Sequence, residues 1–223
     1  MAVVIQHLYL LPMLISVLLS LKAFRLGWPL AYKIFSIFLF TALFTEIFGN
    51  LWHYYLHNFN GWKYSKNNAW IYTASFIPQY VLLMFVYHQA LNSKKMKRII
   101  LFVAIAFSLF TILNFCYWQT LFIINNNTHI AADCIMLLLV FAYFEQLRKA
   151  KEPVKLSVQP MVWISLGVLV FHLLNIPFLL SINYLIRNFP SLATSFLYVY
   201  LLFIFVSYVL YSKAFLCPTP EPK

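Results

Sequence analysis

Acidic residues are nearly missing from this chain of 223 residues, which has five Asp and Glu against 16 Lys and Arg. Charged residues make up 9% of the chain and hydrophobic residues 63%, whereas about a quarter of an ordinary soluble domain is charged. This shortage of charge excludes a soluble globular domain. The three cysteines lack the spacing of a metal site or a disulfide framework, and the four glycines form no GxxxG helix-packing motif.

Long hydrophobic runs take the place of charge. Seven stretches are long enough to cross a bilayer core of about 30 Å, which takes roughly 20 helical residues. We predict an all-α, polytopic membrane helix bundle that forms one transmembrane domain over residues 1–223 and contacts the lipid bilayer. Its seven transmembrane helices are predicted at Val3–Leu21, Ile34–Leu56, Ala69–Leu91, Ile99–Trp118, Thr128–Leu147, Met161–Ile182 and Leu192–Tyr211.

The basic residues indicate how the bundle is oriented. Thirteen of the 16 Lys and Arg residues lie in the connections after odd-numbered spans or in the tail, and only Lys63, Lys66 and Arg187 lie on the other side. By the positive-inside rule, this predicts an N-terminus outside and a C-terminus inside a bacterial cytoplasmic membrane. Clusters such as Lys94–Arg98 then reflect topology and anionic lipid, so we expect no nucleic acid as a partner.

Four polar residues share one face of the second predicted span. Glu46, Asn50, His53 and His57 are spaced i, i+4, i+7 and i+11, which places them on one side of an α-helix. Such a stripe is costly in hydrocarbon, so it is expected to face a cavity, a partner or water. The stripe therefore marks a candidate functional site.

Depth along the helices, at about 1.5 Å of rise per residue, brings further polar residues to the level of this stripe. Gln79 and His172 fall near the midplane of the third and sixth spans, and Asp133 lies about two turns into the fifth. We predict an outward-facing polar cavity walled by the second, third, fifth and sixth spans. Its predicted ligand-binding residues are Glu46, Asn50, His53, Gln79, Asp133 and His172.

This pattern of polar residues is compatible with three functions. The leading interpretation is a transporter-like or sensor-like protein that binds or moves a small polar ligand or cation without catalysis, alone, as a homo-oligomer or with another membrane protein. The second is a metal-dependent intramembrane hydrolase or transferase, with zinc held by His53, His57, His129 and Asp133, whose i, i+4 pairs suit imidazole and carboxylate ligands. The third is a structural or scaffold subunit in which the polar residues hold helices together.

An internal repeat is also suggested by the third and seventh spans. Ser75-Phe76 and Tyr80 are matched 120 residues later by Ser195-Phe196 and Tyr200. Several seven-helix membrane folds consist of two parallel three-helix units joined by one linking helix, and this spacing would fit such an arrangement.

Three short motifs resemble a group of short bacterial seven-helix membrane proteins of unknown function. They are Glu46 to Gly49, the stretch from Tyr72-Thr73 to Gln79-Tyr80, and Pro160-Met161-Val162-Trp163-Ile164 with Gly167. The resemblance covers most of the chain and implies the same fold and location, but no activity. In that group an acidic residue is common where Gln79 stands, so the amide here argues against a paired-carboxylate mechanism.

Overall fold

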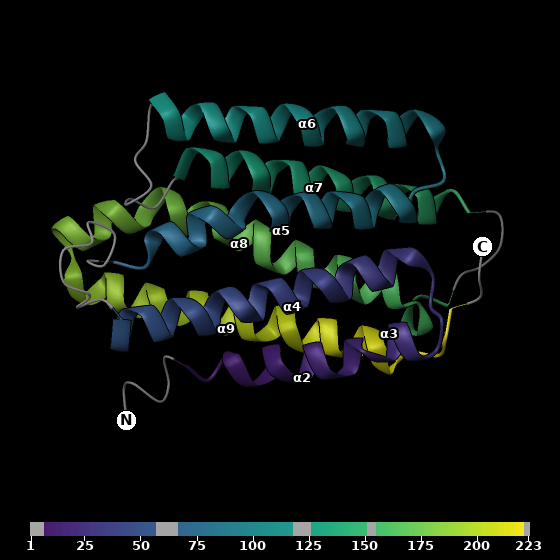
Figure 1. The fold of residues 1–223 in the computed structure, drawn as a ribbon, viewed down its shortest axis with the longest axis horizontal. Helices are drawn as coiled ribbons and strands as arrows, with labels where there is room; N and C mark the ends of the chain where they lie inside the picture. The colour runs from purple at the N-terminus through teal and green to yellow at the C-terminus, as the bar shows by residue number, and fades with distance from the viewer. Residues whose placement is uncertain (1–6, 57–66, 118–125, 151–154, 221–223) are drawn as a thin grey trace.

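The computed structural model describes residues 7–56, 67–117, 126–150 and 155–220. In these ranges the chain is helical apart from turns and short connections, with no strand (Figure 1). The elements in chain order are α2 (Leu10–Ser20), α3 (Lys22–Arg25), α4 (Leu30–Leu51), the π-helical turn η1 (Trp52–Leu56), α5 (Ala69–Ala90), α6 (Lys94–Tyr117), α7 (Asn126–Arg148), the 3-10 turn η3 (Leu156–Val158), α8 (Pro160–Asn188) and α9 (Pro190–Leu216).

Six of the seven predicted spans are confirmed as helices long and apolar enough to cross a membrane, namely α4 with η1 and each of α5 to α9. The first predicted span, Val3–Leu21, is represented by α2, which has 11 residues. A helix of this length is about 16 Å long, roughly half the thickness of the hydrocarbon core. Residues 1–6 lie outside the described ranges, so a seventh span stays a prediction.

Local sequence signals account for several helix ends. Pro160 and Pro190 stand at the first positions of α8 and α9, where a missing backbone N–H breaks no helical hydrogen bond. Gly27 has a φ of 63° in the turn between α3 and α4, a conformation that favours glycine. Pro78 and Pro177 lie inside α5 and α8, where each removes one helical hydrogen bond.

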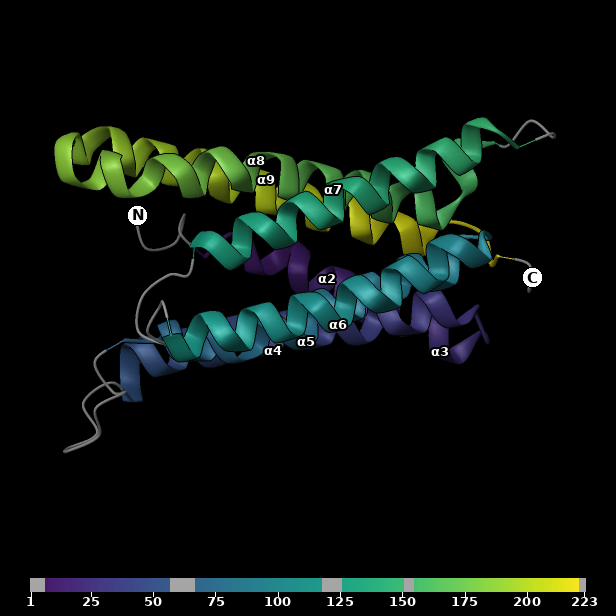
Figure 2. The same ribbon diagram turned by 90° about the horizontal axis from the view of Figure 1, so that it is seen from above.

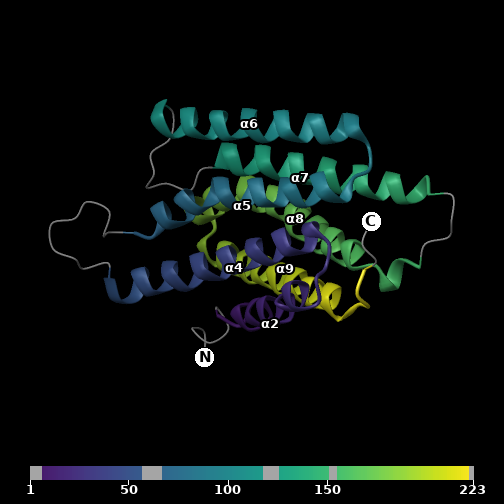
Figure 3. The ribbon, with the colours of Figure 1, turned by 45° about the vertical axis from the view of Figure 1, so that its right-hand side comes forward.

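The long helices form a closed ring. Each of α2, α4, α5, α7, α8 and α9 packs against the next in this order, and α9 packs against α2 again. Helix α6 stays outside the ring, where it packs against α5 and α7 (Figures 1 and 3). Seen from above, α7 to α9 lie on one side and α4 to α6 on the other (Figure 2). Within the ring, α2, α4 and α5 form one group of three helices and α7, α8 and α9 form a second, and α6 connects the two groups along the chain.

Tightly packed side chains fill one end of this interior. Six of them are 0% exposed: Phe35, Leu39, Met84, Tyr87, Ile164 and Phe215. The ring of Phe35 lies 6.2 Å from that of Phe215 and 5.0 Å from that of Tyr211, measured between centroids. Lys22 Nζ donates hydrogen bonds to the backbone oxygens of Phe215 and Cys217, at 3.3 and 3.2 Å. These contacts close the ring where α2 and α9 end.

The helix ends and connections at this end of the bundle, which we call the basic end, contain most of the Lys and Arg residues (Figure 1). The described residues there are Lys22, Arg25, Lys33, Lys94, Lys95, Lys97, Arg98, Arg148, Lys149, Lys155 and Lys213, whereas Arg187 lies at the opposite end. Large apolar side chains point outward between the two ends, among them Phe102 at 73% and Leu138 at 68% exposed. Such a surface suits lipid, since soluble monomers rarely expose large apolar patches.

Candidate functional site

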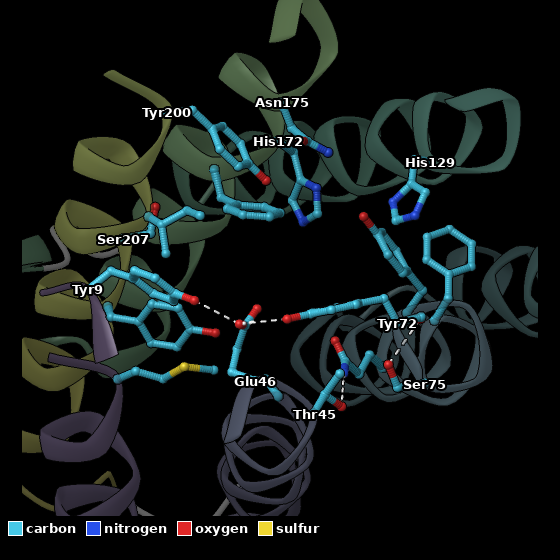
Figure 4. Close-up of a pocket in the computed structure, with 18 of the residues that line it drawn as sticks. Tyr9, Thr45, Glu46, Tyr72, Ser75, His129, His172, Asn175, Tyr200 and Ser207 are labelled. Carbon is cyan, nitrogen blue, oxygen red and sulfur yellow. Dashed lines mark hydrogen bonds between the residues drawn. The ribbon is translucent and has the colours of Figure 1, made fainter. Parts of the chain in front are cut away.

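A cavity of about 460 Å³ lies inside the ring (Figure 4). Residues of α2, α4, α5, α7, α8 and α9 line it, and none of α6 does. Its wall reaches from Asn68 and Ala69, where α5 begins, to Phe38, Leu83 and Tyr211, next to the packed basic end. The cavity thus extends from the end opposite the basic end to the packed side chains near Tyr211.

Glu46 brings a carboxylate to the cavity wall from α4. Its Oε2 accepts a hydrogen bond from the hydroxyl of Tyr9 at 2.8 Å and another from the hydroxyl of Tyr72 at 3.1 Å (Figure 4). Among the described residues, no side chain or backbone group donates a hydrogen bond to its other oxygen, Oε1. Tyr9 directly before α2, Glu46 on α4 and Tyr72 on α5 therefore meet, and the second carboxylate oxygen has no hydrogen-bond donor among the described residues.

Close packing against Gly49 fixes the position of Tyr72. A Cβ at Gly49 would lie 2.7 Å from the Tyr72 hydroxyl, so any larger residue there would push the ring away. The Asn68 side chain donates a hydrogen bond to the backbone oxygen of Gly49 at 3.0 Å, which joins the end of α4 to the start of α5. The glycine one turn after Glu46 is thus required for the hydrogen bond between Tyr72 and Glu46.

A second carboxylate, Asp133 on α7, lies behind the cavity wall and is 0% exposed. The Tyr80 hydroxyl donates to its Oδ1 at 3.1 Å, and Asn175 Nδ2 donates to its Oδ2 at 2.7 Å. His172 Nδ1 lies 2.6 Å from Oδ1. Each oxygen of Asp133 is therefore already occupied by partners from α5 and α8.

Other polar side chains of the wall are held by the protein as well. Gln79 donates a hydrogen bond to the Thr45 hydroxyl at 3.0 Å, which ties α5 to α4. The imidazole of His129 packs against Phe76 with ring centroids 4.1 Å apart. Across the cavity from His129, Tyr200 stacks face to face with Phe178, with ring centroids 4.0 Å apart and 9° between the ring planes (Figure 4).

The predicted ligand-binding residues separate into two groups. Glu46, Gln79 and His172 line the cavity, and Asp133 lies directly behind His172. By contrast, Asn50 and His53 are not among the lining residues. The Asn50 amide donates to the backbone oxygen of Glu46 at 2.8 Å, within its own helix.

Beyond Glu46 the polar stripe does not line the cavity. Asn50, still on α4, already lies off the wall, and a change of helix type follows at His53. His53 belongs to the π-helical turn η1, is exposed, and lies edge to face with Tyr54 at 5.0 Å between centroids. A π-turn has more residues per turn than an α-helix, so the spacing that aligns Glu46 and His53 on an α-helix fails there. His57, the last residue of the stripe, lies outside the described ranges.

The predicted zinc ligands are only partly described, because His57 is among the residues without a described position. His129 lines the cavity and precedes Asp133 by one turn, while His53 does not line it. Over the ranges that the structure describes, no group of three or more His, Cys, Asp or Glu side chains is arranged to hold a metal ion.

Sequence reasoning missed the contribution of α2 and α9 to the wall. Tyr9, Tyr200, Ser207, Tyr208 and Tyr211 all line the cavity. The last four share the helical spacing i, i+7, i+8 and i+11, which is the same kind of signal that singled out Glu46. Figure 4 shows Tyr200 and Ser207 across the cavity from Tyr72.

The described part of the cavity wall contains an acidic residue but no Lys or Arg. The lining residues within the described ranges include one carboxylate, Glu46, and two histidines. Most of the remaining wall is aromatic or aliphatic. Such a mixture of a mainly apolar surface with a few polar groups is typical of small-molecule sites.

Comparison with known proteins adds no further assignment, since no family model, no characterised protein and no solved structure matches this chain.

Proposed function

We propose that this protein binds a small polar ligand or cation in the cavity, as a transporter-like or sensor-like membrane protein. The observation that supports this proposal most directly is the free Oε1 of Glu46 at the wall of a cavity of about 460 Å³. A carboxylate among apolar helices is costly unless something compensates it. Tyr9 and Tyr72 satisfy one of its oxygens, and a ligand would satisfy the other.

Asp133 provides the comparison within the same bundle. It has hydrogen-bonding partners on both oxygens, is 0% exposed, and links α7 to α5 and α8. That arrangement suits a structural polar network. Glu46, in contrast, is only partly buried and borders empty volume, which a purely structural role would not require.

The proposed orientation follows from the basic residues. With the basic end in the cytoplasm of a bacterium, the N-terminus and the end of the cavity at Asn68 would lie toward the outside. The packed side chains around Phe35 and Phe215 would then separate the cavity from the cytoplasm. An outward-facing site closed on the inner side suits either uptake or sensing of an external molecule.

Ligand binding is tested with protein purified in detergent. Thermal unfolding of the wild type is screened against small cations, amines, sugars and amino acids, beside a variant with a filled cavity, Ala42→Phe. Ala42 lines the cavity, so a phenyl ring there would occupy the proposed site. A compound that stabilises the wild type but not Ala42→Phe would support the proposal. A screen in which both proteins respond alike to every compound would contradict it.

Metal content distinguishes this function from a metal-dependent hydrolase or transferase. The purified wild type, His129→Ala and Asp133→Ala would be analysed for zinc. Stoichiometric zinc in the wild type that is lost in both variants would favour the enzyme. On the binding proposal, the zinc content would be substoichiometric and would not change with either substitution.

A further inference from the structure

The cavity restricts the chemical class of its ligand beyond the proposed function, on which this inference rests. The first restriction is charge. Among the lining residues that the structure describes, Glu46 is the single carboxylate, and no Lys or Arg accompanies it. An anionic ligand would find no Lys or Arg in the described part of the wall, whereas a cation would find a carboxylate oxygen that no described residue occupies.

The second restriction is coordination. A bare Mg²⁺ or Ca²⁺ ion takes about six to eight oxygen ligands, and its sites are built from several carboxylates and carbonyls. Glu46 is surrounded instead by the hydroxyls of Tyr9 and Tyr72, which already donate to it. No cluster of metal-binding side chains occurs within the described ranges. The positive charge is therefore better supplied by an ammonium group, which brings its own hydrogen-bond donors.

The third restriction is the aromatic wall opposite Glu46. Phe178 and Tyr200 stack face to face at 4.0 Å, and Phe171 lies 6.4 Å from Tyr200. Aromatic faces bind both apolar groups and organic cations. The cavity volume of about 460 Å³ exceeds what a lone ammonium or alkali ion needs and falls within the range of sites for small organic molecules.

We propose that the ligand is an organic ammonium compound with a ring or branched apolar body. Its ammonium donates to Glu46 Oε1, and its body packs against Phe171, Phe178 and Tyr200. The hydroxyls of Tyr9 and Tyr72 hold the carboxylate in place through Oε2. Gly49 keeps Tyr72 close enough to do so.

The test compares matched probes by isothermal titration calorimetry in detergent. The cationic probes are benzylammonium, 2-phenylethylammonium and cyclohexylammonium chlorides, and the neutral probes are the corresponding alcohols. Methylammonium, sodium and magnesium chlorides represent cations without an apolar body. We expect at least one cationic ring probe to bind, with its alcohol about tenfold weaker or more, since a hydrogen bond to a charged group contributes about 1.5 to 3 kcal/mol.

Two variants locate the interaction. Glu46→Gln should weaken the cationic probe about tenfold or more and leave the alcohol unchanged. The control is Glu145→Gln, which removes an exposed carboxylate that pairs with Arg148 and Lys149 at the basic end, and should change nothing. If Glu46→Gln does not fold, Tyr200→Leu tests the other half of the site, and should weaken ring ammoniums about threefold to thirtyfold without affecting methylammonium.

Each contrary result has its own meaning. If alcohols bind as tightly as ammoniums, or if sodium or magnesium binds through Glu46 and the ring ammoniums do not, the ammonium assignment is wrong while the binding function stands. Unchanged binding of ring ammoniums in both Glu46→Gln and Tyr200→Leu also overturns the assignment. Equal behaviour of the wild type and Ala42→Phe toward every compound would overturn the binding function itself.

Discussion

At the scale of single residues, the two carboxylates inside the bundle, Glu46 and Asp133, differ in how many hydrogen bonds the protein donates to them. Asp133 has partners on both oxygens, and Glu46 on one. Removal of a buried group whose partners then remain unpaired costs more than removal of a group whose donors find an alternative acceptor. The difference predicts unequal effects of two similar substitutions.

Asp133→Asn should destabilise the protein more than Glu46→Gln. The amide at position 133 would have only one acceptor oxygen for the Tyr80, Asn175 and His172 groups. We therefore expect the free energy of unfolding to fall by about 3 kcal/mol. The new amide on α4 would keep an oxygen for the two tyrosine hydroxyls that donate to Glu46, and we expect a loss of about 1 kcal/mol. Denaturant unfolding in detergent measures both, and equal losses would contradict the proposed division between a structural and a ligand-binding carboxylate.

Gly49→Ala should disturb the site through Tyr72. The new Cβ would lie 2.7 Å from the Tyr72 hydroxyl, and we expect a loss of about 1 to 3 kcal/mol from this crowding. In a Tyr72→Leu background, Gly49→Ala should lower the free energy of unfolding much less, because the tyrosine ring that the new Cβ would displace is absent. Additive losses in the double-mutant cycle would show that Gly49 and Tyr72 do not interact.

At the scale of elements, sequence predicted the helices well because their apolar length is a strong signal. The boundaries of α5 agree with the prediction to one residue, and those of α9 extend the predicted span at both ends. The π-turn at His53 could not be foreseen, since its residues fit an α-helical spacing equally well. Tyr9 and Tyr200 were missed for another reason: a tyrosine suits lipid interfaces, packed cores and cavities alike, so spacing alone does not assign it.

Helix α6 offers a matched pair of substitutions on one element. Phe107 is 4% exposed and lies 5.7 Å from the ring of Phe76, whereas Phe102 is 73% exposed. Phe107→Ala should therefore destabilise by about 3 kcal/mol. Phe102→Ala should leave thermal unfolding almost unchanged, because its side chain faces lipid or detergent. Similar losses at both positions would contradict the placement of α6 outside the ring.

The last turn of α9 depends on Lys22, and Cys217 reports on it. Burial raises the pKa of the Cys217 thiol above its ordinary value, so less thiolate is present near neutral pH and maleimide labelling should be slow, rising as the pH increases. Lys22→Met removes the donor to Phe215 and Cys217. Labelling in a Cys116→Ser/Cys134→Ser background should then become about fivefold faster, because the loss of two hydrogen bonds outweighs the slower labelling expected when the Lys22 charge no longer lowers the thiol pKa. An unchanged rate would argue against this capping contact.

At the scale of the whole molecule, the ring explains why the cavity has walls that sequence did not predict. Depth along each helix placed Glu46, Gln79 and His172 at one level, which the cavity lining agrees with. Depth says nothing about which helices are neighbours, because apolar helices in lipid lack the strong pairing signals of soluble folds. The closure of the ring by α2 and α9 therefore became visible only in three dimensions.

Sidedness is a property of the whole molecule that labelling can decide. Single cysteines are introduced at Lys97, at the basic end, and at Asn68, at the opposite end where α5 begins, in protein without other cysteines. In intact cells, an impermeant maleimide should label Asn68→Cys and not Lys97→Cys. The reverse pattern would place the basic end outside and the opposite end in the cytoplasm.

Helix α6 has one further consequence, for how the chain is inserted during synthesis. The end of α2 meets the end of α9 through Lys22 and Cys217, and the end of α5 meets the end of α7 through Asn92 and Gln146. The second group of three helices therefore starts in the same direction as the first. Successive membrane helices alternate in direction, so one extra helix between two groups of three makes both groups start in the same direction. Without α6, helices α7 to α9 would cross the membrane in the opposite direction, and Asp133 and His172 would lie at a different depth. Although α6 does not line the cavity, it determines the orientation in the membrane of α7, α8 and α9, which form half of the cavity wall.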